Sequence, residues 1–237
     1  MPSSFRLMYL SSAGQFWKKK PFKSHLPIQC RMELPEQVKK LKQSKIRFLV
    51  KERMAQFEKA GQSSQIFSEL CFCILTANYS AEGGIKIQKA LGSKFHKLTE
   101  KKLAQQLKKL GHRFPNTRAR FIFDARKQKG ELEGRLRTCD PKEMREWLAE
   151  NVYGIGYKEA SHFLRNIGIT NLAIIDFHIL DILARNKLIK QQKNKTLSKK
   201  KYLEIERVLE ELAKKSKITL AELDLYLWYM ETGKVLK

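Results

Sequence analysis

Apolar residues recur at helical spacing along most of this chain. Across residues 36–60 the apolar residues lie near helical spacing, and Gly61 follows as a stop signal; they are Val38, Leu41, Phe48, Leu49, Met54 and Phe57. The next run, residues 65–77, is apolar on nearly all sides and has Ser63 or Ser64 as a candidate cap. A helix that is apolar all round is buried, so this second segment is predicted to be central.

Capping residues mark the start of further helices. Ser80, Thr99, Asp140 and Ser198 each precede a helical pattern, and Thr219 with Glu222 forms a capping-box sequence. The predicted helices include residues 81–91, 100–111, 116–129 with Gly130 as the stop, a helix from Pro141 with Glu143 as a capping-box residue, 157–166, a helix from Phe177, 198–215 and 220–231. No alternating stretch long enough for a strand occurs, so the predicted fold class is all-α.

The chain is strongly basic. Its 237 residues include 48 Lys and Arg against 24 Asp and Glu, a formal net charge of +24. This excess favours a polyanionic partner, with nucleic acid ahead of an anionic membrane. A lysine-rich surface without a nucleic-acid partner is the simpler alternative. The sequence has no run of 18 apolar residues, so we expect no membrane-spanning helix.

The first 31 residues differ from the rest. They contain no Asp or Glu, include Lys18, Lys19 and Lys20, and have no helical period. Their apolar runs are too short for a secretory signal. We expect a basic leader over 1–31, either disordered or upstream of a true start at Met32, and one catalytic region over 32–237.

Four cysteines are scattered along the chain, at Cys30, Cys71, Cys73 and Cys139. Cys71 and Cys73 lie in the apolar run and are predicted to be small buried residues in a reducing compartment. We therefore expect a cytoplasmic protein, associated with the nucleoid if the source is prokaryotic. The spacing also lacks the four thiolates of an iron–sulfur site, and we expect no metal or other cofactor.

A Gly-Ile-Gly turn at residues 154–156 joins two of the predicted helices. Glycines permit a tight turn where side chains would clash, and Gly168 is placed to cap the following helix. The backbone N–H groups at a helix N-terminus suit a phosphate. Lys158 follows the turn by two residues, and Asp176 lies 18 residues further on.

At these residues the chain resembles the helix-hairpin-helix DNA glycosylases, and more narrowly the archaeal-type 8-oxoguanine DNA glycosylase/AP lyases. The matching pieces are residues 154–160, then Ile174 to Asp176 with His178, and the ending 228–237. The resemblance runs from about Met32 onward. It departs from the endonuclease III branch, which carries an iron–sulfur cluster.

The resemblance implies that Lys158 is the nucleophile and Asp176 its partner. A lysine amine can attack C1′ of a nucleotide and then hold the sugar as a Schiff base. We expect Asp176 to stabilise positive charge on the sugar and to relay protons. Without the resemblance, Lys158 is an ordinary surface lysine and Asp176 the N-cap of a helix from Phe177; His178 is expected to pack beside the hairpin.

Other residues are assigned to DNA and to the damaged base. Arg113 and Phe114, between Gly111 and Pro115, are expected to fill the space left by an extruded base, and Asn78 to contact the duplex. The alternatives are a core role for Phe114 and a helix stop for Asn78.

The resemblance also places Trp228 and the last residue, Lys237, in the damaged-base pocket. Lys237 offers an ammonium donor and, as the final residue, a carboxylate acceptor. From sequence alone, Trp228 is as well explained as a core residue, and the final residues as a frayed end.

The implied architecture is two helical subdomains around a cleft, with the helix-hairpin-helix over about 141–168. The implied activity is removal of 8-oxoguanine from double-stranded DNA, followed by β-elimination at the abasic site, by a monomer that does not act at a membrane. Two alternatives stay open: a glycosylase for oxidised pyrimidines, and a non-catalytic DNA-binding module. The module has no need of Lys158 with Asp176.

Overall fold

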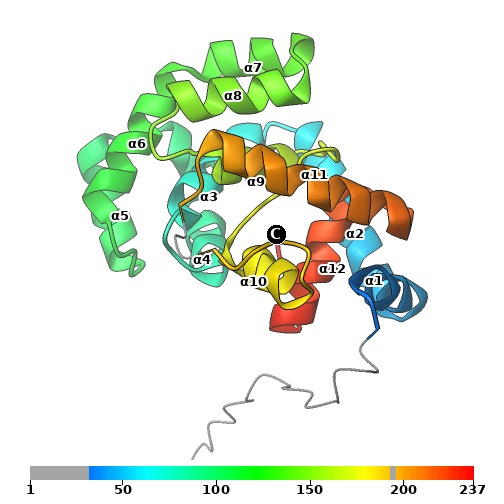
Figure 1. Cartoon of the computed structure of the whole chain (residues 1–237). Helices are drawn as coiled ribbons and strands as arrows, with labels where there is room; N and C mark the ends of the chain where they lie inside the picture. Colours follow the sequence, from blue (N-terminus) through cyan, green and yellow to red (C-terminus); the bar gives the residue numbers. More distant parts are fainter. Residues whose placement is uncertain (1–31, 193–195) are drawn as a thin grey trace, which may run out of the picture. The chain divides into compact units, whose positions relative to one another are not determined.

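The computed structural model describes residues 32–192 and 196–237, and all regular elements in these ranges are helices (Figure 1). In chain order they are α1 (Leu34–Gln43), α2 (Ile46–Gly61), α3 (Ile66–Thr76), α4 (Ala81–Leu91), the 3-10 helix η2 (Gly92–His96), α5 (Glu100–Lys109), α6 (Pro115–Lys127), α7 (Lys129–Thr138), α8 (Pro141–Asn151), α9 (Tyr157–Asn166), α10 (Phe177–Arg185), α11 (Lys199–Ser216) and α12 (Leu220–Thr232). The all-α prediction is confirmed for this part of the chain. The predicted leader, 1–31, lies outside the described residues. No helix in these ranges is long and apolar enough to cross a membrane.

Two hydrophobic clusters hold the helices together. The first surrounds α3, in which all residues but Ile66 and Ser68 are buried, and it draws side chains from α4 to α9. This confirms the central position predicted for the apolar run. The second cluster joins α1 and α2 to α10, α11 and α12. Helix α9 packs against α8, α3 and α2, so it connects elements of both clusters.

A buried ion pair fixes the segment that leads into α10. Arg145 on α8 donates two hydrogen bonds to Glu206 on α11, at 2.6 and 2.9 Å. Glu206 also accepts from the backbone N–H of Ala173 at 2.9 Å, and the Tyr202 hydroxyl donates to the Ala173 carbonyl at 2.7 Å. Because these contacts fix the backbone just before Asp176, the position of that carboxylate is set by both clusters.

The capping predictions hold at four helices. Ser80, Thr99 and Ser198 each accept a hydrogen bond from the third residue of their helix, and Thr219 with Glu222 forms the full capping box. Asp140 caps α8 differently from the prediction. Its side chain accepts from the N–H of Lys142 at 2.8 Å, rather than from Glu143.

Two helix boundaries differ from the sequence prediction. The continuous helix expected over 36–60 is broken at Ser44, whose hydroxyl donates to the Leu41 carbonyl and accepts from the N–H of Ile46. A serine that bonds its local backbone competes with the helix. Gly130 does not stop α6, which ends at Lys127; it lies inside α7, a helix we did not predict. Burial of Leu132 in the first cluster accounts for α7 despite its glycines.

Candidate active site

The turn between α8 and α9 contains two glycines, Gly154 and Gly156, and its conformation requires a glycine at only one of these two positions. Gly154 has φ +81°, and a Cβ there would lie 2.5 Å from the Phe121 ring and 3.0 Å from the Arg118 guanidinium. Gly156 is extended, at φ −106° and ψ −171°, and a Cβ there would meet nothing closer than Glu159 at 3.5 Å. The prediction that a side chain would clash in this turn is therefore correct for Gly154. It is wrong for Gly156, where a Cβ would clash with no atom of the protein.

Helix α9 presents Lys158, His162 and Arg165 on one face, since they are spaced by four and three residues. The Lys158 ammonium lies 3.4 Å from the Glu159 carboxylate, and its side chain is 28% exposed. His162 and Arg165 are buried. Gly168, at φ +95° just past the helix, ends it as predicted. The proposed nucleophile thus stands at the exposed end of a face that becomes buried further along.

Asp176 is the N-cap residue of α10. Its carboxylate accepts a hydrogen bond from the backbone N–H of Ile179 at 2.9 Å, as the capping interpretation predicts. The residue also lines the same cavity as Lys158.

A second acid, Asp224 on α12, lies within electrostatic reach of both residues. It is buried and forms an ion pair with the Arg165 guanidinium. Burial raises the pKa of Asp224, and the charge of Asp176 adds to this, while Arg165 and Lys158 oppose the shift. Together these effects raise the pKa of Asp224 to about 6. The site therefore contains two acids whose charges interact.

His162 and Trp228, which both line the cavity, contain buried ring nitrogens. Neither ring nitrogen of His162 nor Nε1 of Trp228 has a hydrogen-bond partner within the described residues, although all three atoms are buried. Burial lowers the pKa of His162 well below its usual value, and the cations of Arg165, Lys158 and Lys237 add to this. A neutral imidazole can both donate and accept a hydrogen bond.

Trp228 lies among aromatic rings. The His178 ring meets it edge-on, with centroids 4.9 Å apart, and the centroid of the Phe177 ring lies 3.9 Å from that of His178. His178, in the first turn of α10, therefore packs against Trp228 of α12.

These elements surround a cavity of about 1030 Å³. It is bounded by the turn after α3, one face of α9, the segment entering α10, the start of α11, one face of α12 and the chain's last residues. The residues predicted from sequence that line it are Asn78, Arg113, Gly156, Lys158, Asp176, Trp228 and Lys237. Gly154 and Phe114 are not among the lining residues.

Phe114 is nevertheless exposed beside the cavity-lining Arg113. Its side chain is 39% exposed, which excludes a buried core role, and the Arg113 guanidinium lies 4.9 Å from its ring. The buried His112 side chain fixes this loop: it donates to the Leu75 carbonyl at 3.0 Å and accepts from the N–H of Phe114 at 3.0 Å. A fixed loop thus presents an exposed aromatic ring.

Asn78 is in the left-handed region, at φ +60°, directly after α3. Asparagine adopts this conformation more readily than most residues, so the helix-stop interpretation is sufficient for its type. It also lines the cavity and is exposed.

Comparison with known proteins identifies the family. Residues 50–218 match the family model described as 8-oxoguanine DNA glycosylase. A relative from Korarchaeum cryptofilum named 8-oxoguanine DNA glycosylase/AP lyase is 50% identical over 206 residues, which cover 86% of this chain and 98% of the relative. The chain belongs to the 8-oxoguanine DNA glycosylase family.

Solved structures agree with this assignment. The 8-oxoguanine glycosylase/lyase of Methanocaldococcus jannaschii, crystallised with a 15mer DNA containing 8-oxoguanine, is 46% identical, with a TM-score of 0.82. The match covers 86% of this chain and 99% of that one. A non-covalent endonuclease III–DNA complex matches 78% of this chain and 83% of its own, at 19% identity and a TM-score of 0.50, which supports a shared fold only.

The sequence analysis of this family member did not single out four buried residues at or beside the cavity: Glu69, His162, Arg165 and Asp224. A signal was available for each. Glu69 is the single acid of α3, and Asp224 lies between two leucines on α12; buried acids are normally paired. His162 and Arg165 lie one and two turns beyond Lys158 on the same helix face.

Proposed function

We propose that this chain excises 8-oxoguanine from double-stranded DNA through Lys158 and then cleaves the strand at the abasic site. One observation carries the assignment to residues: Lys158 and Asp176 line the same cavity as Trp228 and Lys237. The names of the relatives, 8-oxoguanine DNA glycosylase/AP lyase, support the substrate and both activities.

Lys158 carries both chemical steps in this proposal. Its amine forms a bond to C1′ as the bond from C1′ to the base nitrogen breaks, and the base leaves with a proton. The base takes its proton from solvent. One proton then passes from the lysine nitrogen to the ring oxygen as the bond from C1′ to that oxygen breaks, which leaves a protonated Schiff base. This adduct acidifies the C2′ hydrogen. Removal of that hydrogen as a proton expels the 3′ phosphate by β-elimination. No cofactor enters these steps.

Asp176 acts beside Lys158 as the anionic partner. Its capping bond to α10 fixes the carboxylate, which then stabilises the positive charge that develops on the sugar. Capping and catalysis are compatible, because a carboxylate has two oxygens and the cap uses one of them.

The α8–turn–α9 unit is inferred to be a helix-hairpin-helix that binds one phosphate. No side chain caps the N-terminus of α9, so its first N–H groups are available to an anion. The protein's own packing leaves room for a Cβ at Gly156. The glycine there is accounted for by close approach of the DNA backbone.

The exposed loop at Arg113 and Phe114 is assigned to the duplex together with Asn78, whose neighbour Tyr79 packs on His112 and donates to the Gly111 carbonyl. Extruding a base leaves an unstacked gap, which apolar and aromatic side chains fill. Phe114 has the exposure that this role requires. The half-buried Trp228 and Lys237 are assigned to the extruded base, which can stack on the indole.

Borohydride trapping distinguishes the candidate functions. Reduction of the Schiff base on an 8-oxoguanine duplex gives a covalent complex, and the thymine-glycol duplex gives much less. Preferential trapping on thymine glycol would instead indicate a glycosylase for oxidised pyrimidines. Binding to both duplexes without any covalent complex would indicate a non-catalytic module.

A further inference from the structure

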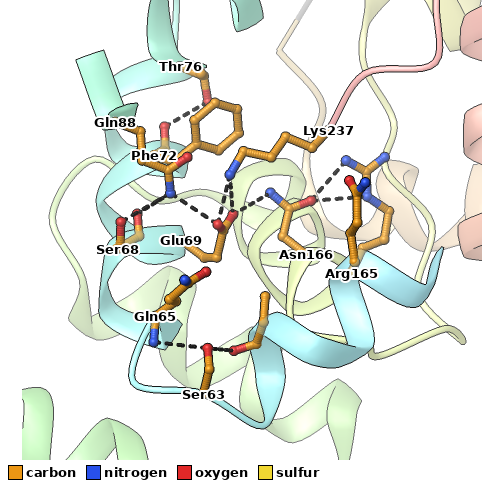
Figure 2. A network of polar contacts seen from close by, with 12 residues as sticks. Ser63, Gln65, Ser68, Glu69, Phe72, Thr76, Gln88, Arg165, Asn166 and Lys237 are labelled. Atoms are coloured by element: carbon orange, nitrogen blue, oxygen red, sulfur yellow. Dashed lines mark hydrogen bonds and ion pairs between the residues drawn. The ribbon is translucent and has the colours of Figure 1, made fainter. Parts of the chain in front are cut away.

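Glu69 is a buried acid in the apolar helix α3. Its side chain is 7% exposed, and both its oxygens accept hydrogen bonds from the Lys237 ammonium, at 2.7 and 2.9 Å (Figure 2). The Lys237 side chain is 16% exposed, and its ammonium also lies 4.6 Å from the centre of the Phe72 ring. The last residue is thus connected by its side chain to the centre of the first cluster.

Two amides complete the surroundings of the Glu69 carboxylate. Gln88 on α4 donates to one oxygen at 3.0 Å, and Asn166 on α9 donates to the other at 3.1 Å. Asn166 also accepts from Arg165, the partner of Asp224. The carboxylate is therefore held in place from three directions, and Figure 2 shows Lys237 reaching it from the chain end.

The final segment has few other anchors. Val235 is partly buried and packs against the second cluster, and its carbonyl accepts a hydrogen bond from Arg53 at 3.3 Å. None of the residues from Trp228 to Lys237 is fully buried, and Gly233 and Lys234 are exposed. Lys234 pairs only with Glu82, and both side chains are more than half exposed, so this pair stabilises weakly. The Glu69–Lys237 pair is shielded from water, and its Coulomb attraction is correspondingly stronger.

We infer that Glu69 is the positioning residue that holds Lys237 at the wall of the base cavity. With its ammonium bound to Glu69, Lys237 is an anchored wall residue rather than a mobile cation. Loss of the negative charge at residue 69 releases the segment and degrades the fit of the cavity to the base. This inference rests on the proposed function where it concerns the base, whereas the anchoring itself is independent of it.

The anchoring is tested by release of Lys237 from the 237-residue chain by carboxypeptidase B, followed by intact mass. Glu69→Gln removes the charge and keeps the shape. We expect release to accelerate by about tenfold or more, the effect of about 1.4 kcal/mol. Glu206→Gln is the matched control, because it also breaks a buried carboxylate ion pair, with Arg145. It should leave the release rate within about twofold of the parent.

The functional consequence is tested by the ratio of two activities. Glu69→Gln should lower excision of 8-oxoguanine by about tenfold more than cleavage of a preformed abasic site, which has no base to read. Glu206→Gln should change both rates by the same factor. Combining Glu69→Gln with Lys237→Met should lower the ratio no further than Lys237→Met alone, because Glu69 acts through Lys237.

Unaltered release of Lys237 in folded Glu69→Gln overturns the inference, whatever the activities are. If Glu69→Gln does not fold, Glu69→Asp carries the same test, since it keeps the charge but withdraws the carboxylate by one methylene. Should the parent fail to excise 8-oxoguanine, the proposed function falls, and the release assay still decides the anchoring.

Discussion

The carboxylate of Asp176 accepts a hydrogen bond from the backbone N–H of Ile179 at 2.9 Å, while the same residue lines the cavity beside Lys158. This hydrogen bond fixes the proposed catalytic carboxylate at the start of α10. It also allows the two roles of Asp176 to be separated by mutation, because asparagine is as good an N-cap as aspartate but carries no charge.

Asp176→Asn should therefore keep the fold and lose the chemistry. We expect thermal stability close to the parent's and single-turnover excision lower by roughly 10²-fold or more. Asp176→Ala should lose the cap as well, destabilising the protein by about 1 kcal/mol. Calorimetry and single-turnover kinetics measure the two effects. Near-normal excision by Asp176→Asn would leave the residue as a cap only.

Lys158→Gln should abolish base release and covalent trapping together, because one amine is assigned both steps. Duplex binding should stay within a few-fold of the parent, since the residue contributes one charge among many. Lys142→Gln, which removes an exposed lysine paired with Glu210, is the control and should leave trapping intact. A borohydride-trapped complex with Lys158→Gln would place the nucleophile at another lysine.

Phe114→Ala should impair extrusion of the base. Excision from a fully paired duplex should fall by roughly tenfold or more, since unstacking costs a few kcal/mol. A substrate whose damaged base is already unpaired should be affected less. Phe48→Ala is a matched control, because Phe48 is also exposed and lies 4.6 Å from the guanidinium of its neighbour, Arg47. Equal losses on both substrates would indicate a packing role for Phe114.

Affinity for DNA should fall steeply with salt. The net charge of +24 implies release of counterions from several phosphates on binding. Between about 50 and 200 mM salt we expect a loss of roughly 10³-fold, measured by fluorescence anisotropy with a labelled duplex. A flat response across this range would separate the charge of the chain from DNA binding.

Asp224 should make stability depend on pH below neutrality. Its pKa is raised by burial to about 6, above the ordinary 3.8, so the folded state binds the proton more tightly. The stabilising contribution of protonated Asp224 is complete below about pH 4 and is lost as the pH rises through about 6. Asp224→Asn lacks this loss.

The melting temperature of Asp224→Asn, relative to the parent, should thus increase between about pH 4 and pH 7. The exposed Asp181→Asn serves as the control and should show a flat difference. A falling difference for Asp224→Asn would mean that the ion pair with Arg165 lowers the pKa of Asp224 more than burial raises it.

The sequence by itself determined the helical class, most helix starts and the glycine turn before α9. These features are local: a cap bonds within three residues, and Gly154 needs its left-handed conformation wherever the turn occurs. The boundaries it missed, at Ser44 and at α7, depend on a competing hydroxyl and on the burial of Leu132.

The tertiary structure alone decided how the remote parts meet. Glu69 and Lys237 are 168 residues apart, and Arg165 and Asp224 are 59 apart, so no local pattern could pair them. Each pair is a consequence of burial, because a charge removed from water requires a partner and the fold determines which one is near. The resemblance named Lys158, Asp176, Trp228 and Lys237 as site residues, whereas only packing showed that all four line one cavity.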